Sequence, residues 1–303
     1  KKAYLQLRKI SNSYPSNEKL RFNLAFMEQD QGYIEAAKKS YLKLIEEFNN
    51  FNSKINLYNI YLREKQYLKS LDLIDNILKI KKDLYNVWVD KAYIYYKTKE
   101  YKLSKKICSF ILKKEKSNIK ALNLIGLCLF KEKEYDDSLE FLFKGLKINN
   151  YDLSLLNSIG EVYFEIRDIK KSEKYYLDAL EINPNSFQTL NNLAGFYLET
   201  NNSEKAVKYY NKALKFYPDE PTILGNISKA YFSLNKNNLA KKYSKKSLNI
   251  KSSASVHKLL SNIYLKEENF IKAWHHFDGR LIEDSFIKRN ETYDIIKNKL
   301  LNK

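Results

Sequence analysis

Three histidines and two cysteines are the residues of this chain best suited to metal or thiol chemistry. Cys108 and Cys128 have a spacing that matches no metal motif, and we interpret them as small apolar packing residues. His275 and His276 are adjacent, so on a helix they point in different directions and cannot easily share one metal. His257 stands alone. We therefore expect no metal site, and buried free thiols favour a reducing compartment such as the cytoplasm.

The residues of an active site are missing as well. Seven glycines leave little from which to build a phosphate-binding loop. We find no nucleophile elbow and no paired-carboxylate pocket. No apolar run approaches the ~18 residues of a membrane span. We expect neither an active site nor a cofactor within this chain, and no membrane-spanning segment.

A repeat in the sequence defines the structural elements that position the side chains. A small residue recurs with a step of 33 or 34 residues, and such a period is typical of one supersecondary unit copied end to end. Arrays of this kind build extended surfaces rather than closed catalytic pockets. The recurring residues, here named the rung residues, are Ala3, Ala37, Ser70, Ser104, Ser138, Ser172, Ala206, Ala240 and Ala273.

Other residues keep fixed distances from the rung residues. A second small residue stands twelve positions earlier in most repeats, as at Gly126 and Gly160, and apolar residues often follow at four and seven positions. Offsets of three, four and seven place side chains on one face of a helix. Each repeat therefore predicts two short helices, A and B, which cross closely where both carry a small residue.

This pattern resembles the tetratricopeptide repeat family. The best match is Leu156-x-x-Ile159-Gly160-x-x-Tyr163, followed by Ser172, and the next repeat matches in the same way. The resemblance covers nearly the whole chain and extends to bacterial arrays that precede transferase domains. It implies an all-α fold, a right-handed α-solenoid of tandem 34-residue helix-turn-helix repeats.

The family's frame divides residues 1–303 as a single array. Residues 1–13 supply helix B of a truncated repeat, and residues 282–303 a C-terminal capping helix. The chain starts without Met and inside a repeat, so we expect it to be part of a longer polypeptide. Eight repeats begin near Glu18, Phe51, Tyr85, Ile119, Leu153, Phe187, Pro221 and Ala254.

Two residues depart from the pattern. Tyr58 replaces the small residue of helix A in the second repeat, so we expect its helices to be spread or shifted. Arg280 replaces a small or apolar residue in the last repeat. The segment Ala273-Trp274-x-x-Phe277-x-x-Arg280 resembles the closing helix of bacterial arrays that precede transferase-like domains.

The net charge of +18 admits two interpretations. A basic surface can attract nucleic acid or anionic membranes. The alternative is a solvated lysine-rich exterior, and three observations favour it: arginine is scarce, the lysine pairs fall mostly on helix B, and acidic residues are interleaved throughout. We expect no specific nucleic-acid binding.

In the family, the concave face is lined by the second, fifth, sixth, ninth, twelfth and thirteenth residues of each repeat. Exposed aromatic residues there would mark a binding site, although the same residues could instead pack between helices. Carrying the positions over predicts a peptide-binding face of Asn23, Asn56, Asn59, Asp90, Tyr93, Tyr96, Asn123, Phe130, Asn157, Glu161, Asn192 and Asn226. Beside them come Phe22, Phe26, Leu127, Phe164, Asn191, Lys229 and Phe232.

Asparagine shares the sixth position in four repeats, at Asn23, Asn56, Asn192 and Asn226. An amide can hold a peptide backbone through one acceptor and two donor hydrogens. In this respect the array resembles the repeat region of protein O-linked N-acetylglucosamine transferases. The alternative is that asparagine is simply abundant in this chain.

These observations predict a protein- or peptide-binding scaffold. One alternative is a non-catalytic, substrate-presenting arm of a larger glycosyl- or sulfotransferase-like enzyme, and another is nonspecific nucleic-acid binding. The partner is expected to be a protein or an extended peptide. The oligomeric state and the partner's identity are not fixed by the sequence.

Overall fold

A capping side chain precedes several of the first helices of the repeats. In the computed structural model, which describes residues 2–281 and side chains from 3 to 277, the oxygens of Asn17, Asn118 and Asp152 each accept the backbone N–H three residues later at 3.0 Å. Such caps satisfy a donor that the first helical turn leaves unpaired. The helices therefore begin where the repeat frame places them.

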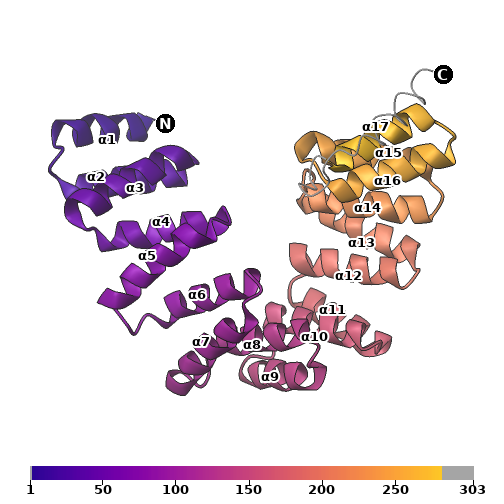
Figure 1. Ribbon diagram of the computed structural model, residues 1–303, viewed down its shortest axis with the longest axis horizontal. Coiled ribbons are helices and arrows are strands. Elements are labelled where there is room, and N and C mark those ends of the chain that lie inside the picture. Colours follow the sequence, from indigo (N-terminus) through magenta and orange to yellow (C-terminus); the bar gives the residue numbers. More distant parts are fainter. Residues whose placement is uncertain (1, 282–303) are drawn as a thin grey trace, which may run out of the picture. The chain divides into compact units, whose positions relative to one another are not determined.

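Seventeen helices make up residues 2–281, and no strand occurs in that range (Figure 1). Each repeat consists of a helix A, which is one of the even-numbered helices α2 to α16, and the helix B that follows it. The helices are α1 (Lys2–Ser13), α2 (Glu18–Asp30), α3 (Ile34–Phe48), α4 (Phe51–Arg63), α5 (Tyr67–Ile80), α6 (Tyr85–Lys97), α7 (Tyr101–Lys114), α8 (Ile119–Lys131), α9 (Tyr135–Ile148), α10 (Leu153–Glu165), α11 (Ile169–Ile182), α12 (Phe187–Glu199), α13 (Ser203–Phe216), α14 (Pro221–Ser233), α15 (Asn237–Ile250), α16 (Ala254–Lys266) and α17 (Phe270–Leu281).

The turn from helix A to helix B is built in the same way in every repeat. One residue adopts the left-handed conformation, for example Lys99 with φ 66° and Lys133 with φ 67°. The next residue closes the turn, as when the N–H of Glu134 donates to the carbonyl of Leu129 at 2.9 Å. This is the Schellman arrangement, which satisfies carbonyls at a helix end. Only the first repeat supplies the favoured glycine, Gly32.

The small residues do mark close crossings between helices A and B. The rung serines are fully buried, and each donates its hydroxyl to the backbone carbonyl of the residue twelve positions earlier on helix A. Ser138 donates to Gly126 at 2.7 Å, and Ser172 donates to Gly160 at 2.8 Å. A longer side chain would separate the two backbones, so the predicted crossing at Gly160 and Ser172 is confirmed.

The crossing of the second repeat is kept although Tyr58 stands in place of the small residue, and the expectation of spread or shifted helices stays a prediction. Ser70 still donates to the carbonyl of Tyr58 at 3.1 Å, much as the other serines do at their crossings. The tyrosine ring leaves the crossing and reaches the next helix A, where its hydroxyl donates to Asp90 at 3.1 Å. A large residue is tolerated because its side chain extends toward α6 instead of between α4 and α5.

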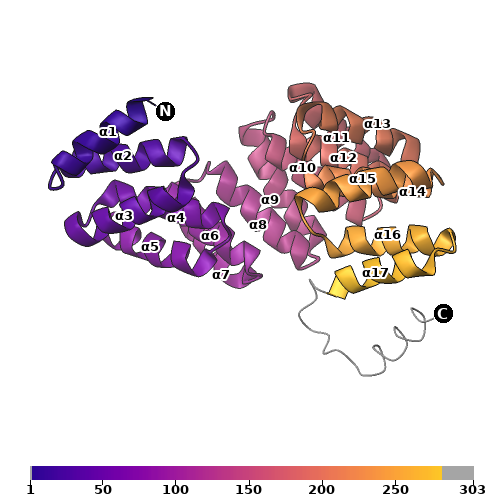
Figure 2. The same ribbon diagram turned by 90° about the horizontal axis from the view of Figure 1, so that it is seen from above.

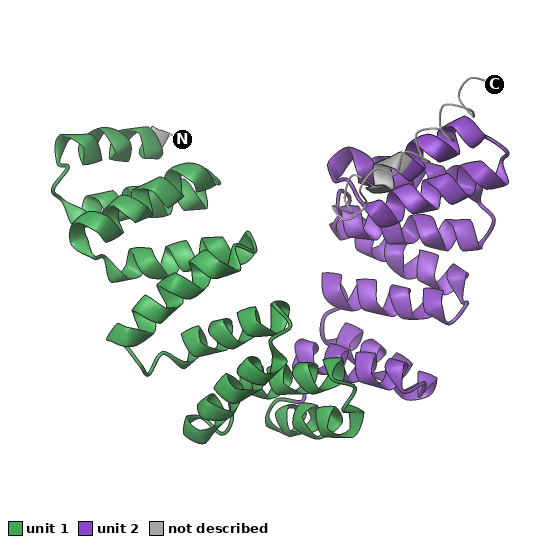
Figure 3. Ribbon diagram, in the orientation of Figure 1, with its two compact units in different colours: residues 1–149 green, residues 150–303 purple. Residues whose placement is uncertain are grey.

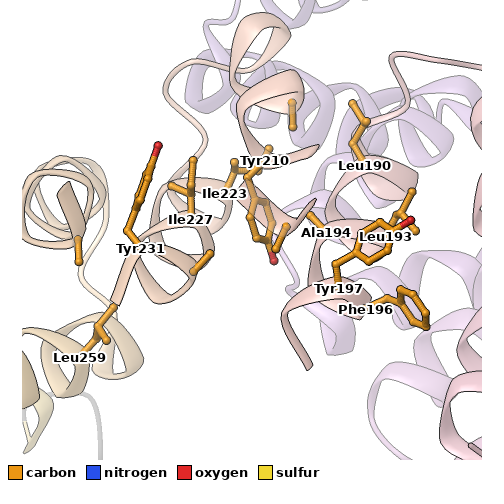
Figure 4. Close-up of a cluster of buried hydrophobic side chains, with 14 of the residues drawn as sticks. Leu190, Leu193, Ala194, Phe196, Tyr197, Tyr210, Ile223, Ile227, Tyr231 and Leu259 are labelled. Carbon is orange, nitrogen blue, oxygen red and sulfur yellow. The ribbon is translucent and has the colours of Figure 1, made fainter. Parts of the chain in front are cut away.

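The chain divides after Asn149 into two compact units (Figure 3). Unit 1 buries two apolar clusters, one around Tyr41, Leu57 and Ile74 and another around Cys108 and Ile125. Unit 2 buries one continuous cluster from Tyr176 to Ala273, part of which is shown in Figure 4. Neighbouring repeats share these clusters, as expected for a solenoid.

One pair of rings stacks in every repeat of unit 2. A tyrosine near the end of helix A lies against an aromatic residue of helix B, with ring centroids 5.4 to 5.6 Å apart. Tyr163, Tyr197 and Tyr231 each stack on a tyrosine. In the last repeat, whose helices α16 and α17 lie side by side (Figure 2), Tyr264 stacks on His276 instead.

The predicted all-α repeat solenoid is confirmed. The expectation of one continuous array stays a prediction. The capping helix of residues 282–303 lies outside the described residues, and so does the side chain of Arg280.

Candidate interaction surface

The outward side chains of α2, α4, α6 and α8 form a surface that we call the unit 1 wall. Among these helices, α6 and α8 approach each other directly. The ninth, twelfth and thirteenth residues of each repeat lie near the ends of these helices. On the unit 1 wall, residues at the same position of successive repeats therefore recur from one helix A to the next.

Two aromatic side chains on the unit 1 wall are exposed. Phe26, at the ninth position of its repeat, is 53% exposed, and Tyr93, at the same position two repeats later, is 38% exposed. A cavity of about 410 Å³ opens beside Phe26 and is lined by Ile34 and Ile60 and by the polar residues Gln29, Asp30, Arg63 and Glu64. Burying such apolar surface against a partner is favourable, by roughly 25 cal/mol for each Å² removed from water.

Cations lie over the rings of the unit 1 wall. The ammonium group of Lys97 is 5.1 Å from the ring centroid of Tyr93 and 5.5 Å from that of Tyr96. The ammonium group of Lys131 is 4.4 Å from the ring centroid of Phe130. Because a ring face attracts a cation, the contact of Lys97 keeps positive charge beside the exposed ring of Tyr93.

Two predicted surface residues are buried. Asn157 is 2% exposed, and its amide donates to the carbonyl of Leu153 at 2.7 Å and to the hydroxyl of Thr189 at 2.8 Å. Phe130 is 8% exposed, with its ring 6.0 Å from that of Tyr135. The prediction that they form an open face is wrong for both residues, because the adjoining structure already covers them.

Three other predicted residues are half-buried and hydrogen-bonded to neighbouring helices. Asn56 donates to the hydroxyl of Tyr41 at 3.0 Å, and Asn226 donates to Asn191 at 3.1 Å. Asp90 accepts from Tyr58, and burial raises the pKa of its carboxyl, against the opposing effects of Tyr58 and Lys120. These side chains connect helices, so only their remaining hydrogen-bonding capacity could reach a partner.

The remaining predicted residues vary in exposure. Asn23 is exposed, and Tyr96, Asn59, Asn123, Glu161 and Asn192 are half-buried. Asn59 donates to the carbonyl of Ile55 in its own helix at 2.9 Å. The asparagines at the sixth position are therefore divided between helix packing and the surface. That Asn23 and Asn192 contact a peptide stays a prediction.

Sequence reasoning missed a histidine pair. The Nδ1 atoms of His257 and His276 are 3.1 Å apart although nineteen residues separate them, so His257 does not stand alone. Burial and the charges of His257, His275 and Lys245 lower the pKa of His276 to about 4. Spacing along one helix could not reveal the pair, because the two residues lie on α16 and α17.

The two cysteines are enclosed in the core. Cys108 and Cys128 are buried free thiols, and burial raises the pKa of Cys108 to about 12. Such a thiol stays protonated at neutral pH and is a poor nucleophile. Over the part of the chain that the structure describes, no three side chains of the metal-binding types gather as ligands. Among the helices of residues 2–281, none is both long and apolar enough to cross a membrane.

The fold and its surface define a class: this is a helical repeat solenoid, which offers an extended wall instead of a closed pocket. Residues 151–219 and 221–253 match models of the tetratricopeptide repeat. The same helix pairs, crossings and turns occur in the other repeats. The chain is a tetratricopeptide repeat protein, and a scaffold role in protein interaction is typical of these repeats.

Solved structures agree on the fold. The chain is similar to a tetratricopeptide repeat protein from Parabacteroides merdae, with a TM-score of 0.57 and 15% identity over 80% of this chain and 96% of that one. It is similar to Pseudomonas aeruginosa pilF, with a TM-score of 0.56 and 15% identity over 71% and 97% of the two chains. It also resembles a chain of the APC/C hetero-tetramer Cut9-Hcn1, with a TM-score of 0.64 and 14% identity, and 94% of this chain covers 57% of that one.

At these identities the likeness shows the fold alone. A search of curated protein sequences gave no match.

Proposed function

We propose that this protein binds an extended segment of a partner protein along the unit 1 wall. The observation that carries the proposal is the exposure of Phe26 and Tyr93 at equivalent positions of two repeats. Apolar side chains of the core need no partner, whereas aromatic residues exposed at equivalent positions on one wall are typical of binding surfaces.

The rest of the wall supports this interpretation. The cavity beside Phe26 is lined by Ile34 and Ile60 and by the polar residues Gln29, Asp30, Arg63 and Glu64, so it could take one apolar side chain of the partner while its polar rim contacts a polar group. Large aromatic and arginine side chains are the residues that most often dominate binding energy at interfaces. Asn23 and Asn59 on the same wall could hydrogen-bond to the backbone of an extended segment.

The test begins with peptides selected on the immobilised protein from a random-peptide phage library. The affinity of the selected peptides is then measured by fluorescence anisotropy. Phe26→Ala combined with Tyr93→Ala should weaken binding about tenfold or more, which corresponds to about 1.4 kcal/mol. Circular dichroism should show unchanged helicity, because both side chains are exposed.

Leu68→Ala combined with Ile80→Ala is the matched control. Both side chains belong to α5 in the same unit, and they are 84% and 54% exposed. The control should leave the affinity within about threefold of the wild-type value. If the control weakens binding as much as the change on the wall does, the partner uses helices B and the proposal is wrong.

A further inference from the structure

Lysines are concentrated on two consecutive helices B of unit 2. Together, α13 and α15 contain eight lysines and a single acidic residue, Glu204. The helices B before them mix the two charges: α9 contains two lysines and three acidic residues, and α11 contains three of each. A general abundance of lysine would leave acidic residues among the lysines, as on α9 and α11, so it does not account for the charge of α13 and α15.

Most of this charge is not neutralised by neighbouring side chains. Three of the eight lysines form ion pairs with carboxylates. Within residues 3–277, no carboxylate pairs with any of the other five, of which four are exposed and one, Lys212, is half-buried. We call these five the unit 2 lysine patch: Lys208, Lys212, Lys215, Lys242 and Lys245.

The two halves of the patch lie next to each other. Lys246 of α15 reaches the segment that follows α13, where its ammonium group donates to the carbonyl of Pro218 at 2.9 Å and pairs with Asp219 at 3.0 Å. Lys242 is one helical turn before Lys246 and therefore shares its face of α15. Lys215 stands three residues before Pro218. The lysines of α15 therefore continue the positive surface that begins on α13.

Apolar side chains border the unit 2 lysine patch. Phe216, the last residue of α13, is 47% exposed, and Ile250, the last residue of α15, is 46% exposed. This surface therefore offers apolar groups beside its positive charge. A cavity of about 690 Å³ on α13 brings the two kinds of group together and is lined by Lys208, Tyr209, Asn211, Lys212, Lys215 and Phe216.

We propose that the unit 2 lysine patch binds the surface of an anionic lipid bilayer. Lysines on a helix face are attracted to negatively charged headgroups, and Phe216 and Ile250 would enter the boundary between headgroups and acyl chains. The inference concerns unit 2 and does not depend on the function proposed for the unit 1 wall.

Nucleic acid, the other common polyanion, fits this surface less well. Its phosphate backbone offers no apolar layer for Phe216 and Ile250. Arginine, whose planar group pairs bidentately with phosphate, is absent from both helices. Lysines beside exposed apolar residues match a charged surface with an apolar interior, which is what a bilayer provides.

One other helix B is as basic and supplies the matched control. The sequence of α7 contains five lysines and no acidic residue. The helices B before and after it, α5 and α9, contain five acidic residues between them, so acidic groups surround the charge of α7. The control variant replaces four exposed lysines of α7 by glutamine: Lys102, Lys106, Lys113 and Lys114.

Co-sedimentation with vesicles at about 0.15 M salt tests the inference. One set of vesicles contains phosphatidylcholine alone, and the other contains about one third phosphatidylglycerol, which is anionic. A fluorescein-labelled single-stranded oligonucleotide of mixed sequence probes the alternative by anisotropy. The apolar variant is Phe216→Gln with Ile250→Gln. The patch variant combines Lys208→Gln, Lys212→Gln, Lys242→Gln and Lys245→Gln.

The wild-type protein should bind the anionic vesicles at least about tenfold more tightly than the neutral ones. The patch variant should lose that preference, whereas the α7 control should stay within about threefold of the wild-type affinity. The apolar variant should weaken vesicle binding about threefold or more. Circular dichroism checks folding, and Lys208→Gln with Lys212→Gln alone keeps the test valid if the fourfold variant unfolds.

Three results would overturn the inference. The first is that the wild-type protein does not sediment with the anionic vesicles. The second is that the α7 control loses as much vesicle binding as the patch variant does, because the attraction would then be general to the basic surface. The third is that the patch variant loses the oligonucleotide as well, while the apolar variant keeps full affinity for vesicles. In that case the patch binds polyanions such as nucleic acid and has no preference for a bilayer.

Discussion

The crossing at Gly160 offers the sharpest test of how this repeat packs. A Cβ atom added there would lie 2.8 Å from Cε1 of Tyr176 and 3.0 Å from two other atoms of that ring. The ring has little room to move, because Tyr176 is 4% exposed and packs against Phe196 with centroids 6.0 Å apart. The backbone is also held by the hydroxyl of Ser172. Gly160→Ala should therefore overpack the crossing at a cost of about 1–3 kcal/mol.

Gly195 provides the comparison that isolates this cost. It also lies inside a helix A of unit 2, but its added Cβ would meet no atom closer than the Tyr210 hydroxyl at 3.7 Å. Gly195→Ala should stabilise the protein by about 1 kcal/mol, because alanine favours a helix more than glycine does. Gly160→Ala gains the same amount, so the difference between the two variants is the packing cost alone.

Thermal unfolding followed by circular dichroism measures both variants. Hydrogen exchange of the amides in α10 and α11 locates the change. Each kcal/mol corresponds to roughly 2–4 °C in a unit of this size, and Gly160→Leu should lower the midpoint further than Gly160→Ala. Equal midpoints for Gly160→Ala and Gly195→Ala would refute the reasoning, since the crossing would then accept a side chain freely.

Two further predictions concern the last repeat and the turns between helices A and B. The pKa of His276 is lowered to about 4 in the folded protein from an ordinary 6.5, so the unfolded chain takes up the proton first. Stability of the last repeat should be fully present above about pH 6.5 and fall as the pH drops toward 4. His276→Tyr should remove that dependence, as hydrogen exchange of α16 across this pH range would show. Lys133→Gly should raise the free energy of unfolding by about 0.5–1 kcal/mol, because glycine adopts the left-handed conformation at less cost. Asn201→Gly should gain less in the same denaturation assay, since asparagine already tolerates that conformation, and an equal gain would contradict this explanation.

The repeat frame could be predicted because its cause is local. A crossing between two helices needs small side chains at two points, and the points recur with the length of the repeat. The serine hydroxyls that bond across the crossings follow from the same spacing, as at Ser104, which donates to the carbonyl of Ala92 at 2.8 Å. Tyr58 shows the limit of that reasoning. Its backbone carbonyl takes part in the crossing as the spacing predicts, but its side chain reaches Asp90 of the next repeat, which the spacing does not reveal.

The candidate surface was only partly predictable. The family's positions placed Tyr93 and Asn23 on a face, and both are exposed. The same positions gave Asn157, which is buried because Thr189 of the next repeat lies against it. A position on a helix fixes the direction of a side chain, but its exposure depends on what the adjacent repeat places in front of it.

The sequence by itself determined the repeat length, the helices and their crossings, because these depend on contacts within one repeat or with the next. It also determined the charge of each position, including the cations of α4, α6 and α8. Only the tertiary structure decided which side chains remain in contact with water. Phe26 is exposed, Phe130 is buried, and His276 lies against His257, because these outcomes depend on the packing of separate helices in space, which spacing along the chain does not encode.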